Sequence, residues 1–241
     1  MNDFLFENRA VVTKFFELAA AISGSWYLRK TKNKKLKVFV YYLWLTVIVE
    51  TLATYRIFLQ KDYTYEWFIA IKNSVFYQNR WLYNIYGFLT IGLLGVFYSD
   101  LLTSKTFKLL IRTIVVIYSV FSFFYYTLTD AFFEMGLPYD DILASIITIT
   151  YVICYFIELM RSEYILQYYK LPSFYISVVL LLWSLCVTPL FIFNDYFRAV
   201  NTEFVIFRIL MLLYINILSY SCLTFGFWYS LNKSKQLIKS K

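Results

Sequence analysis

Seven long apolar stretches dominate the sequence and constrain the fold more than any other feature. They cover residues 11–28, 38–59, 81–103, 109–129, 142–160, 172–193 and 205–231. A helix needs about 20 mostly apolar residues to cross the hydrocarbon core of a bilayer. The pattern therefore predicts an all-α, polytopic membrane protein with seven transmembrane helices. Little sequence is left for a soluble domain, so we expect a single seven-helix domain over residues 1–241.

The apolar stretches favour helices over strands. A membrane-spanning strand alternates in polarity over about 10 residues, whereas "LLIRTIVVIYSVFSFFYY" (109–126) is apolar on all sides. Backbone groups in lipid must be hydrogen-bonded within the spanning structure, and a helix does this with its own backbone. The composition agrees, since 61% of the residues are hydrophobic and 16% are charged. Soluble domains average about 45–50% apolar and about 25% charged residues.

Lysine and arginine are concentrated in alternate connectors, and this predicts the orientation. The first connector holds six of them: Arg29, Lys30, Lys32, Lys34, Lys35 and Lys37. Fourteen lie in one alternating set of segments, which comprises 29–37, 104–108, 161–171 and 232–241. Five lie in the other set, which comprises 1–10, 60–80, 130–141 and 194–204. Basic residues beside spans stay in the cytoplasm, so we expect the N-terminus outside and residues 232–241 as a short basic cytoplasmic tail.

The net charge of +8 does not indicate a nucleic-acid-binding protein. The positive charges lie in short loops and a tail beside apolar stretches, not on a folded basic face. Residues 29–37 then act as topology anchors, with binding of anionic lipid head groups as the alternative. We expect the lipid bilayer as the main partner and no nucleic acid.

Several kinds of chemistry are excluded by the residues that the sequence lacks. It contains no histidine, which removes His-ligated metals and histidine general bases. The three cysteines, Cys154, Cys186 and Cys222, fall in three different apolar stretches and lack metal-ligand spacing. No glycine-rich nucleotide-binding motif is present. We therefore expect no metal, no cofactor and no catalytic residues.

Polar side chains inside apolar stretches are costly and usually face the bundle interior or a water-filled cavity. With a rise of about 1.5 Å per residue, Glu50 lies about 13 Å and Glu17 about 9 Å from the outer ends of their stretches. Both carboxylates thus reach similar depths in the outer half. We expect six residues to line an outward-facing pocket for a small polar ligand or ion: Glu17, Glu50, Arg56, Asn84, Arg208 and Asn216.

A structural interpretation of the same residues stays open. Glu50 would then pair with an arginine or accept a hydrogen bond from a tyrosine, and Glu17 would pair with Lys14 one turn earlier. Arg56 and Arg208 would direct their charges outward to the membrane surface.

Two local features carry further predictions. The connector 60–80, the longest on the outside, is expected to form a short interfacial helix with Tyr63, Tyr65, Trp67 and Tyr77 at head-group level. The glycines of "IGLLG", Gly92 and Gly95, should allow close packing of the third stretch.

In span count, topology and loop charge, the chain resembles the small, uncharacterised seven-helix proteins of bacterial inner membranes. It is also similar in plan to seven-span sensor modules that are elsewhere fused to kinase or cyclase domains. The resemblance covers the whole chain and transfers no functional residue. It implies an integral protein of the bacterial inner membrane. Because the tail has only ten residues, we expect no output domain, so that a signal would pass to a separate protein.

These observations favour a non-enzymatic sensor or accessory subunit that binds a ligand in the outer polar pocket. The first alternative is a carrier or pore for small solutes or ions, including an oligomeric membrane-permeabilising effector. Glycine and proline, which often interrupt helices at transport sites, number only six and three, and this favours a fairly rigid bundle. The second alternative is an intramembrane lipid-modifying enzyme using Glu17, Glu50, Asp100 or tyrosines. A cytoplasmic or membrane protein and further copies of the chain are the expected partners.

Overall fold

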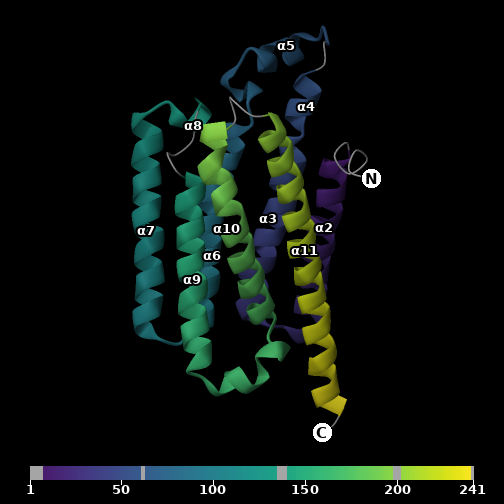
Figure 1. The fold of residues 1–241 in the computed structure, drawn as a ribbon, viewed down its shortest axis with the longest axis vertical. Helices are drawn as coiled ribbons and strands as arrows, with labels where there is room; N and C mark the ends of the chain where they lie inside the picture. The colour runs from purple at the N-terminus through teal and green to yellow at the C-terminus, as the bar shows by residue number, and fades with distance from the viewer. Residues whose placement is uncertain (1–7, 61–62, 135–139, 198–201, 240–241) are drawn as a thin grey trace.

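The computed structural model describes residues 8–60, 63–134, 140–197 and 202–239, and within these ranges the chain forms helices and no strands (Figure 1). Seven long helices run along the molecule: α2 (Arg9–Thr31), α3 (Lys37–Ala53), α6 (Arg80–Leu101), α7 (Lys105–Leu128), α9 (Asp140–Met160), α10 (Pro172–Phe197) and α11 (Thr202–Lys239). Each predicted apolar stretch coincides with one of them, and α4 (Tyr55–Leu59) continues the second. The all-α prediction is confirmed.

Six helical segments of the described chain are long and apolar enough to cross a membrane: Lys34–Leu59, Arg80–Leu101, Lys105–Leu128, Asp141–Met160, Pro172–Phe193 and Glu203–Lys233. The predicted first span, α2, is long enough at 23 residues but is not among them. Lys14 and Glu17 lie in its first half and lower its hydropathy. Six of the seven predicted spans are therefore long and apolar enough to cross a membrane.

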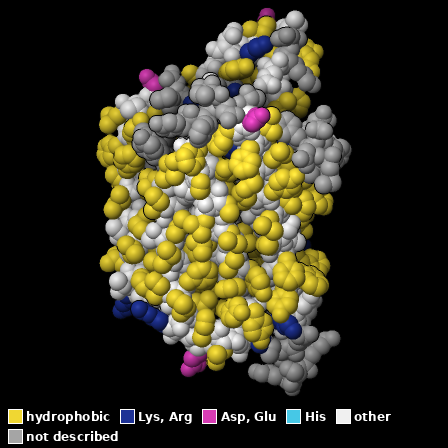
Figure 2. Space-filling view, in the orientation of Figure 1, with side chains coloured by type: hydrophobic (Ala, Val, Ile, Leu, Met, Phe, Trp, Pro, Cys, Tyr) yellow, Lys and Arg dark blue, Asp and Glu magenta, His cyan; other side chains and the backbone are white. Residues whose placement is uncertain are grey.

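The surface has the pattern of an integral membrane protein. Apolar side chains cover the middle of the face seen in Figure 2, and charged side chains gather near the two ends. Large apolar residues point outward along the long helices, for example Ile48, Ile117 and Leu218. In water such a surface would be unfavourable, whereas lipid tails match it.

Six of the long helices form a closed ring. Around it, α2 packs on α3, α3 on α6, α6 on α9, α9 on α10 and α10 on α11, and α11 returns to α2. The seventh long helix, α7, lies outside the ring and packs mainly on α6 (Figure 1). Although α2 is the least apolar of the seven, it is needed to close the ring between α3 and α11.

The two ends of the bundle differ. We call one the α5 end; it carries α4, α5 (Glu66–Lys72), η2 (Val75–Tyr77) and α8 (Ala131–Glu134). The other, the basic end, carries η1 (Lys34–Leu36) and η3 (Glu163–Lys170). The short helix predicted within 60–80 is present as α5. Trp67 within it and Tyr63 and Tyr65 before it are exposed, and Tyr77 is half-buried. Its position at a membrane surface stays a prediction.

The half of the bundle next to the basic end is densely packed. Tyr98 on α6 is fully buried and shares a hydrogen bond of 3.0 Å with Ser177 on α10. Tyr155 on α9 shares one of 2.8 Å with Ser173. These hydrogen bonds join three neighbouring helices and satisfy hydroxyl groups that have no access to solvent.

Glu158, near the end of α9, holds the start of α7. Its carboxylate accepts hydrogen bonds from the backbone N–H groups of Thr103 and Ser104, and from the Thr103 hydroxyl at 2.7 Å. Ser104 is the N-cap of α7 and makes no side-chain capping hydrogen bond of its own. Glu158 thus supplies the negative charge and acceptor atoms that a helix N-terminus favours.

The two glycines of the third stretch behave differently. A Cβ atom on Gly95 would overlap Cγ2 of Val115 on α7 and lie 3.3 Å from the Tyr151 hydroxyl on α9. Close packing is therefore confirmed at Gly95. At Gly92 the prediction of close packing is wrong, because a Cβ atom there would meet nothing within 4 Å.

Candidate functional site

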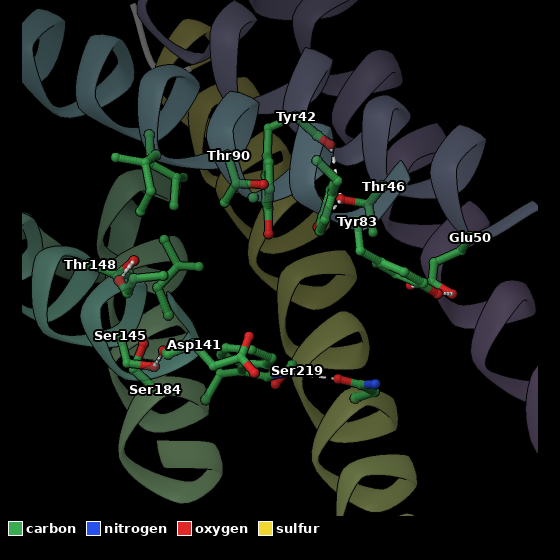
Figure 3. A pocket seen from close by; sticks show the side chains of 18 of the residues that line it. Tyr42, Thr46, Glu50, Tyr83, Thr90, Asp141, Ser145, Thr148, Ser184 and Ser219 are labelled. Carbon is green, nitrogen blue, oxygen red and sulfur yellow. Dashed lines mark hydrogen bonds between the residues drawn. The ribbon is translucent and has the colours of Figure 1, made fainter. Parts of the chain in front are cut away.

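A cavity of about 910 Å³ lies inside the ring of six helices (Figure 3). All six ring helices contribute residues to its wall, and α7 contributes none. Along α6 it extends from Arg80 to Leu94, which is about 21 Å at 1.5 Å per residue. Sites for small molecules typically enclose about 300–1,000 Å³, so the cavity is large enough for an organic ligand.

The cavity is closed toward the basic end. Six apolar residues form its floor, and each is at most 6% exposed: Phe39, Leu43, Ile91, Leu94, Val179 and Leu223. At the α5 end its wall includes Arg80 and Asp141, in the first turns of α6 and α9, and Asp141 is exposed. The cavity therefore approaches the surface at the α5 end.

The polar wall follows the helical repeat. On α3, Tyr42, Thr46 and Glu50 are spaced four residues apart, which places them on one face of the helix. Figure 3 shows Thr46, Glu50 and Tyr83 on one side of the space and Asp141, Ser145 and Ser184 on another. The hydroxyl-bearing wall residues are Tyr42, Thr46, Tyr83, Tyr86, Thr90, Ser145, Thr148, Ser184, Ser219 and Tyr220. Such a wall offers many hydrogen-bond donors and acceptors to a polar ligand.

Hydrogen bonds across the wall fix some of these groups. The Thr46 and Tyr86 hydroxyls share a hydrogen bond of 3.0 Å between α3 and α6. The indole N–H of Trp183 on α10 donates to Oδ1 of Asn216 on α11 at 3.0 Å. The polar wall is thus partly ordered before any ligand arrives.

Two carboxylates occupy the α2–α3 side of the cavity. The Tyr83 hydroxyl lies 3.3 Å from each carboxylate oxygen of Glu50 and donates to it. Glu17 is only 3% exposed, and its Oε2 has no hydrogen-bond partner in the described structure. The two carboxylates lie close enough to interact electrostatically, and Lys14 interacts with both.

Four of the six predicted site residues line the cavity: Glu17, Glu50, Asn84 and Asn216. The Asn84 amide also donates to the Phe132 carbonyl at 2.8 Å and so joins α6 to α8. Arg56 and Arg208 are not wall residues. Arg56 lies on α4 and is exposed.

The structure also contains some of the interactions that the structural interpretation of Glu17 and Glu50 predicts. A tyrosine hydroxyl does partner Glu50, and Lys14 lies within electrostatic reach of Glu17. Neither carboxylate forms an ion pair with Lys14 among the described side chains. Both carboxylates remain on the cavity wall, so the structural interactions leave them available to a ligand.

Sequence reasoning missed the tyrosines. Tyr42, Tyr86 and Tyr220 line the cavity. They were not predicted because the chain has 24 tyrosines, and their number alone does not indicate which of them form a site. The spacing of Tyr42, Thr46 and Glu50 was the signal that could have found them, because polar residues at this repeat mark one helix face.

Metal binding finds no support in the described residues, which contain no group of three or more Cys, Asp or Glu side chains placed to hold an ion. No family model, curated protein or solved structure matches the chain. The cavity is therefore the feature of this chain that points to a function.

Proposed function

We propose that this protein is a non-enzymatic membrane sensor or accessory subunit that binds a small polar ligand in the central cavity. The observation that supports it is the shape of the cavity: polar walls, an apolar floor and an approach from one end. A ligand entering at the α5 end would touch several ring helices at once. Beyond the floor, the described residues of the half next to the basic end are densely packed, which favours binding over passage through the bundle.

The proposal includes an orientation. All seven long helices, α2 among them, cross the bacterial inner membrane, with the basic end in the cytoplasm. Basic connectors support this, as do four cation–π contacts at that end: Lys30 on Trp26 at 5.3 Å, Lys37 on Tyr41 at 5.4 Å, Lys170 on Tyr169 at 5.5 Å and Lys233 on Tyr229 at 5.8 Å. Lysines beside aromatic rings are typical of a membrane–water interface.

A pair of single-cysteine variants tests the orientation. Thr64→Cys lies at the α5 end and Lys34→Cys at the basic end, and both positions are exposed. In a background without the native cysteines, a membrane-impermeant maleimide added to intact cells should label Thr64→Cys alone. Labelling of Lys34→Cys before the membrane is opened would overturn the orientation.

Signalling follows from the ring. A ligand can shift helix packing only if it binds two packings with different affinity. Bound between the α2–α3 side and the α9–α10 side, it would change how these helices meet at the basic end. There, a separate cytoplasmic or membrane protein would detect the change through the basic connectors.

Fluorescence of Trp183 gives a direct test of ligand binding, because this side chain lines the cavity and bonds Asn216. The protein in nanodiscs would be titrated with a panel of small neutral, cationic and anionic polar compounds of similar size. We expect a saturable change with at least one compound, and loss of that change in Trp183→Phe.

A matched pair of variants locates the binding. Ser219→Phe on α11 fills part of the cavity and should abolish the saturable change. Ser221→Phe makes the same substitution two residues away, at a groove between α2 and α11 outside the cavity, and should preserve it. Equal effects of the two variants, or no response to any compound, would overturn the proposal.

A flux measurement distinguishes a carrier from the proposed sensor. A compound that binds in the nanodisc assay would be offered, radiolabelled, to liposomes containing the protein. A sensor binds it without moving it into the lumen, so lumenal counts should equal those of protein-free liposomes. Saturable uptake that Ser219→Phe blocks would establish a carrier instead.

A further inference from the structure

The charged groups on the cavity wall are mostly acidic. Glu17, Glu50 and Asp141 contribute three carboxyl groups, and Arg80 contributes the one guanidinium among the wall residues that the structure describes. Arg80 and Asp141 are both at the α5 end of the cavity, in the first turns of α6 and α9, whereas Glu17 and Glu50 lie deeper. Lys14, which is not a wall residue, offsets part of this negative charge. The inner wall itself presents two carboxylates and no basic side chain among the described residues, which favours a positively charged guest.

Glu17 is the most informative of these groups. Its side chain is 97% buried, since only 3% is exposed, and Oε2 has no hydrogen-bond partner within the described chain. A buried carboxylate oxygen without a partner is unfavourable. The cavity lies directly beside it, so a ligand with N–H donors or a positive charge would satisfy it.

Aromatic rings accompany the carboxylates. Tyr42 and Tyr86 lie parallel, with ring centroids 6.5 Å apart and an interplanar angle of 16°. Tyr220 is within electrostatic reach of both tyrosines and of Glu17 and Glu50, and all five residues line the same cavity. Carboxylates combined with tyrosine rings match the chemistry by which proteins recognise organic ammonium groups.

We infer that the ligand is a small organic cation whose ammonium group lies between Glu17 and Glu50, against the rings of Tyr42, Tyr86 and Tyr220. This inference rests on the proposed ligand-binding function and names its ligand class. The uncharged part of the ligand would face the hydroxyls of Ser145, Ser184 and Ser219 across the cavity. A bare metal ion fits less well, because the cavity is far larger than an ion needs and the described residues hold no cluster of metal ligands.

Matched pairs of compounds test the charge requirement without any variant. Choline would be compared with neohexyl alcohol, phenethylamine with phenethyl alcohol and putrescine with butanediol, each by calorimetric titration of the full chain in nanodiscs. The members of each pair are similar in size and differ in charge. We expect at least one cation to bind tenfold or more tightly than its neutral counterpart.

Variants then identify the carboxylate that binds the positive charge of the ligand. Glu17→Gln keeps the shape and removes the charge, and should weaken binding of that cation by about tenfold to a hundredfold with little effect on the neutral compound. Glu66→Gln makes the same change on the exposed surface of α5 and should have no effect. Glu50→Gln serves as the second test if Glu17→Gln does not fold.

Each outcome decides something specific. Equal binding of cations and neutral counterparts would overturn the cation inference and leave the proposed function in place. If none of these cations or alcohols binds but other polar compounds change the fluorescence of Trp183, the cation inference is again overturned and the proposed function stays in place. If no compound of either panel binds, the proposed function fails, and the inference fails with it.

Discussion

Tyr86 and Tyr98 lie on the same helix, α6, yet their hydroxyl groups face different kinds of interior. Tyr86 lines the cavity and is only partly shielded, whereas Tyr98 is completely buried in the packed half next to the basic end. The same helices therefore build a hollow half and a dense half. In the dense half Tyr98 and Tyr155 each have one serine partner, and in the hollow half much of the polar wall faces open space.

The two halves also differ in how far a carboxylate is hydrogen-bonded. Glu158, at the basic end, accepts hydrogen bonds from Thr103 and Ser104 and caps α7. Glu17, beside the cavity, has an unpartnered oxygen although it is more deeply buried. A protein built only for stability would satisfy both. Under the proposed function, the hollow half binds the ligand and the dense half holds the bundle together.

The largest effect is expected where volume is added to the dense half. Gly95→Leu would drive a side chain into Val115 and Tyr151, and overpacking of this kind should lower the free energy of unfolding by about 3 kcal/mol. The measurement is the thermal unfolding midpoint in one detergent, together with the yield of monodisperse protein.

Two variants serve as controls, because each introduces a leucine where the structure has open space. Gly92→Leu, on the same helix, enters open space and should leave stability unchanged or raise it by up to about 1 kcal/mol. Ala144→Leu points a similar side chain into the cavity and should also be tolerated. If Ala144→Leu destabilised as much as Gly95→Leu, the hollow half would not be hollow.

An intermediate effect is expected at the cap of α7. Glu158→Gln removes the negative charge and one acceptor oxygen from the start of this helix, and should cost about 2 kcal/mol of unfolding free energy. The control is Glu163→Gln, the same change at an exposed position on η3. It should alter the unfolding midpoint very little, and a matching loss there would show that Glu158 acts only through overall charge.

Much of this architecture was predictable from the sequence, because apolar runs near 20 residues long have few alternatives to membrane helices. α2 was the difficult case. Its Glu17 lowers its hydropathy, yet the residue faces the interior of the ring and not lipid. Hydropathy averages over all faces of a helix and cannot tell an inward polar residue from a lipid-facing one.

The candidate site was predictable in part. Depth along each helix predicted Glu17, Glu50 and Asn84 in one layer and Asn216 deeper, and all four line the cavity. Depth alone could not give the direction in which a side chain points. Arg56 illustrates this, since its side chain is exposed and lines no part of the cavity. The cavity itself depends on how six helices close into a ring, and no local pattern specifies that.

The smallest effect comes from deleting single hydroxyl groups, and it compares the two halves directly. Tyr98→Phe leaves the Ser177 hydroxyl fully buried without its partner and should cost about 1 kcal/mol. Tyr86→Phe should cost less than about 0.5 kcal/mol, because Thr46 still donates to the Tyr42 carbonyl at 3.0 Å and water in the cavity can replace the lost hydroxyl. Thermal unfolding of both variants, with the exposed Tyr41→Phe as reference, measures the difference. Equal losses at Tyr98 and Tyr86 would mean that the cavity wall is as dry as the core, and the division of the bundle into a binding half and a holding half would fail.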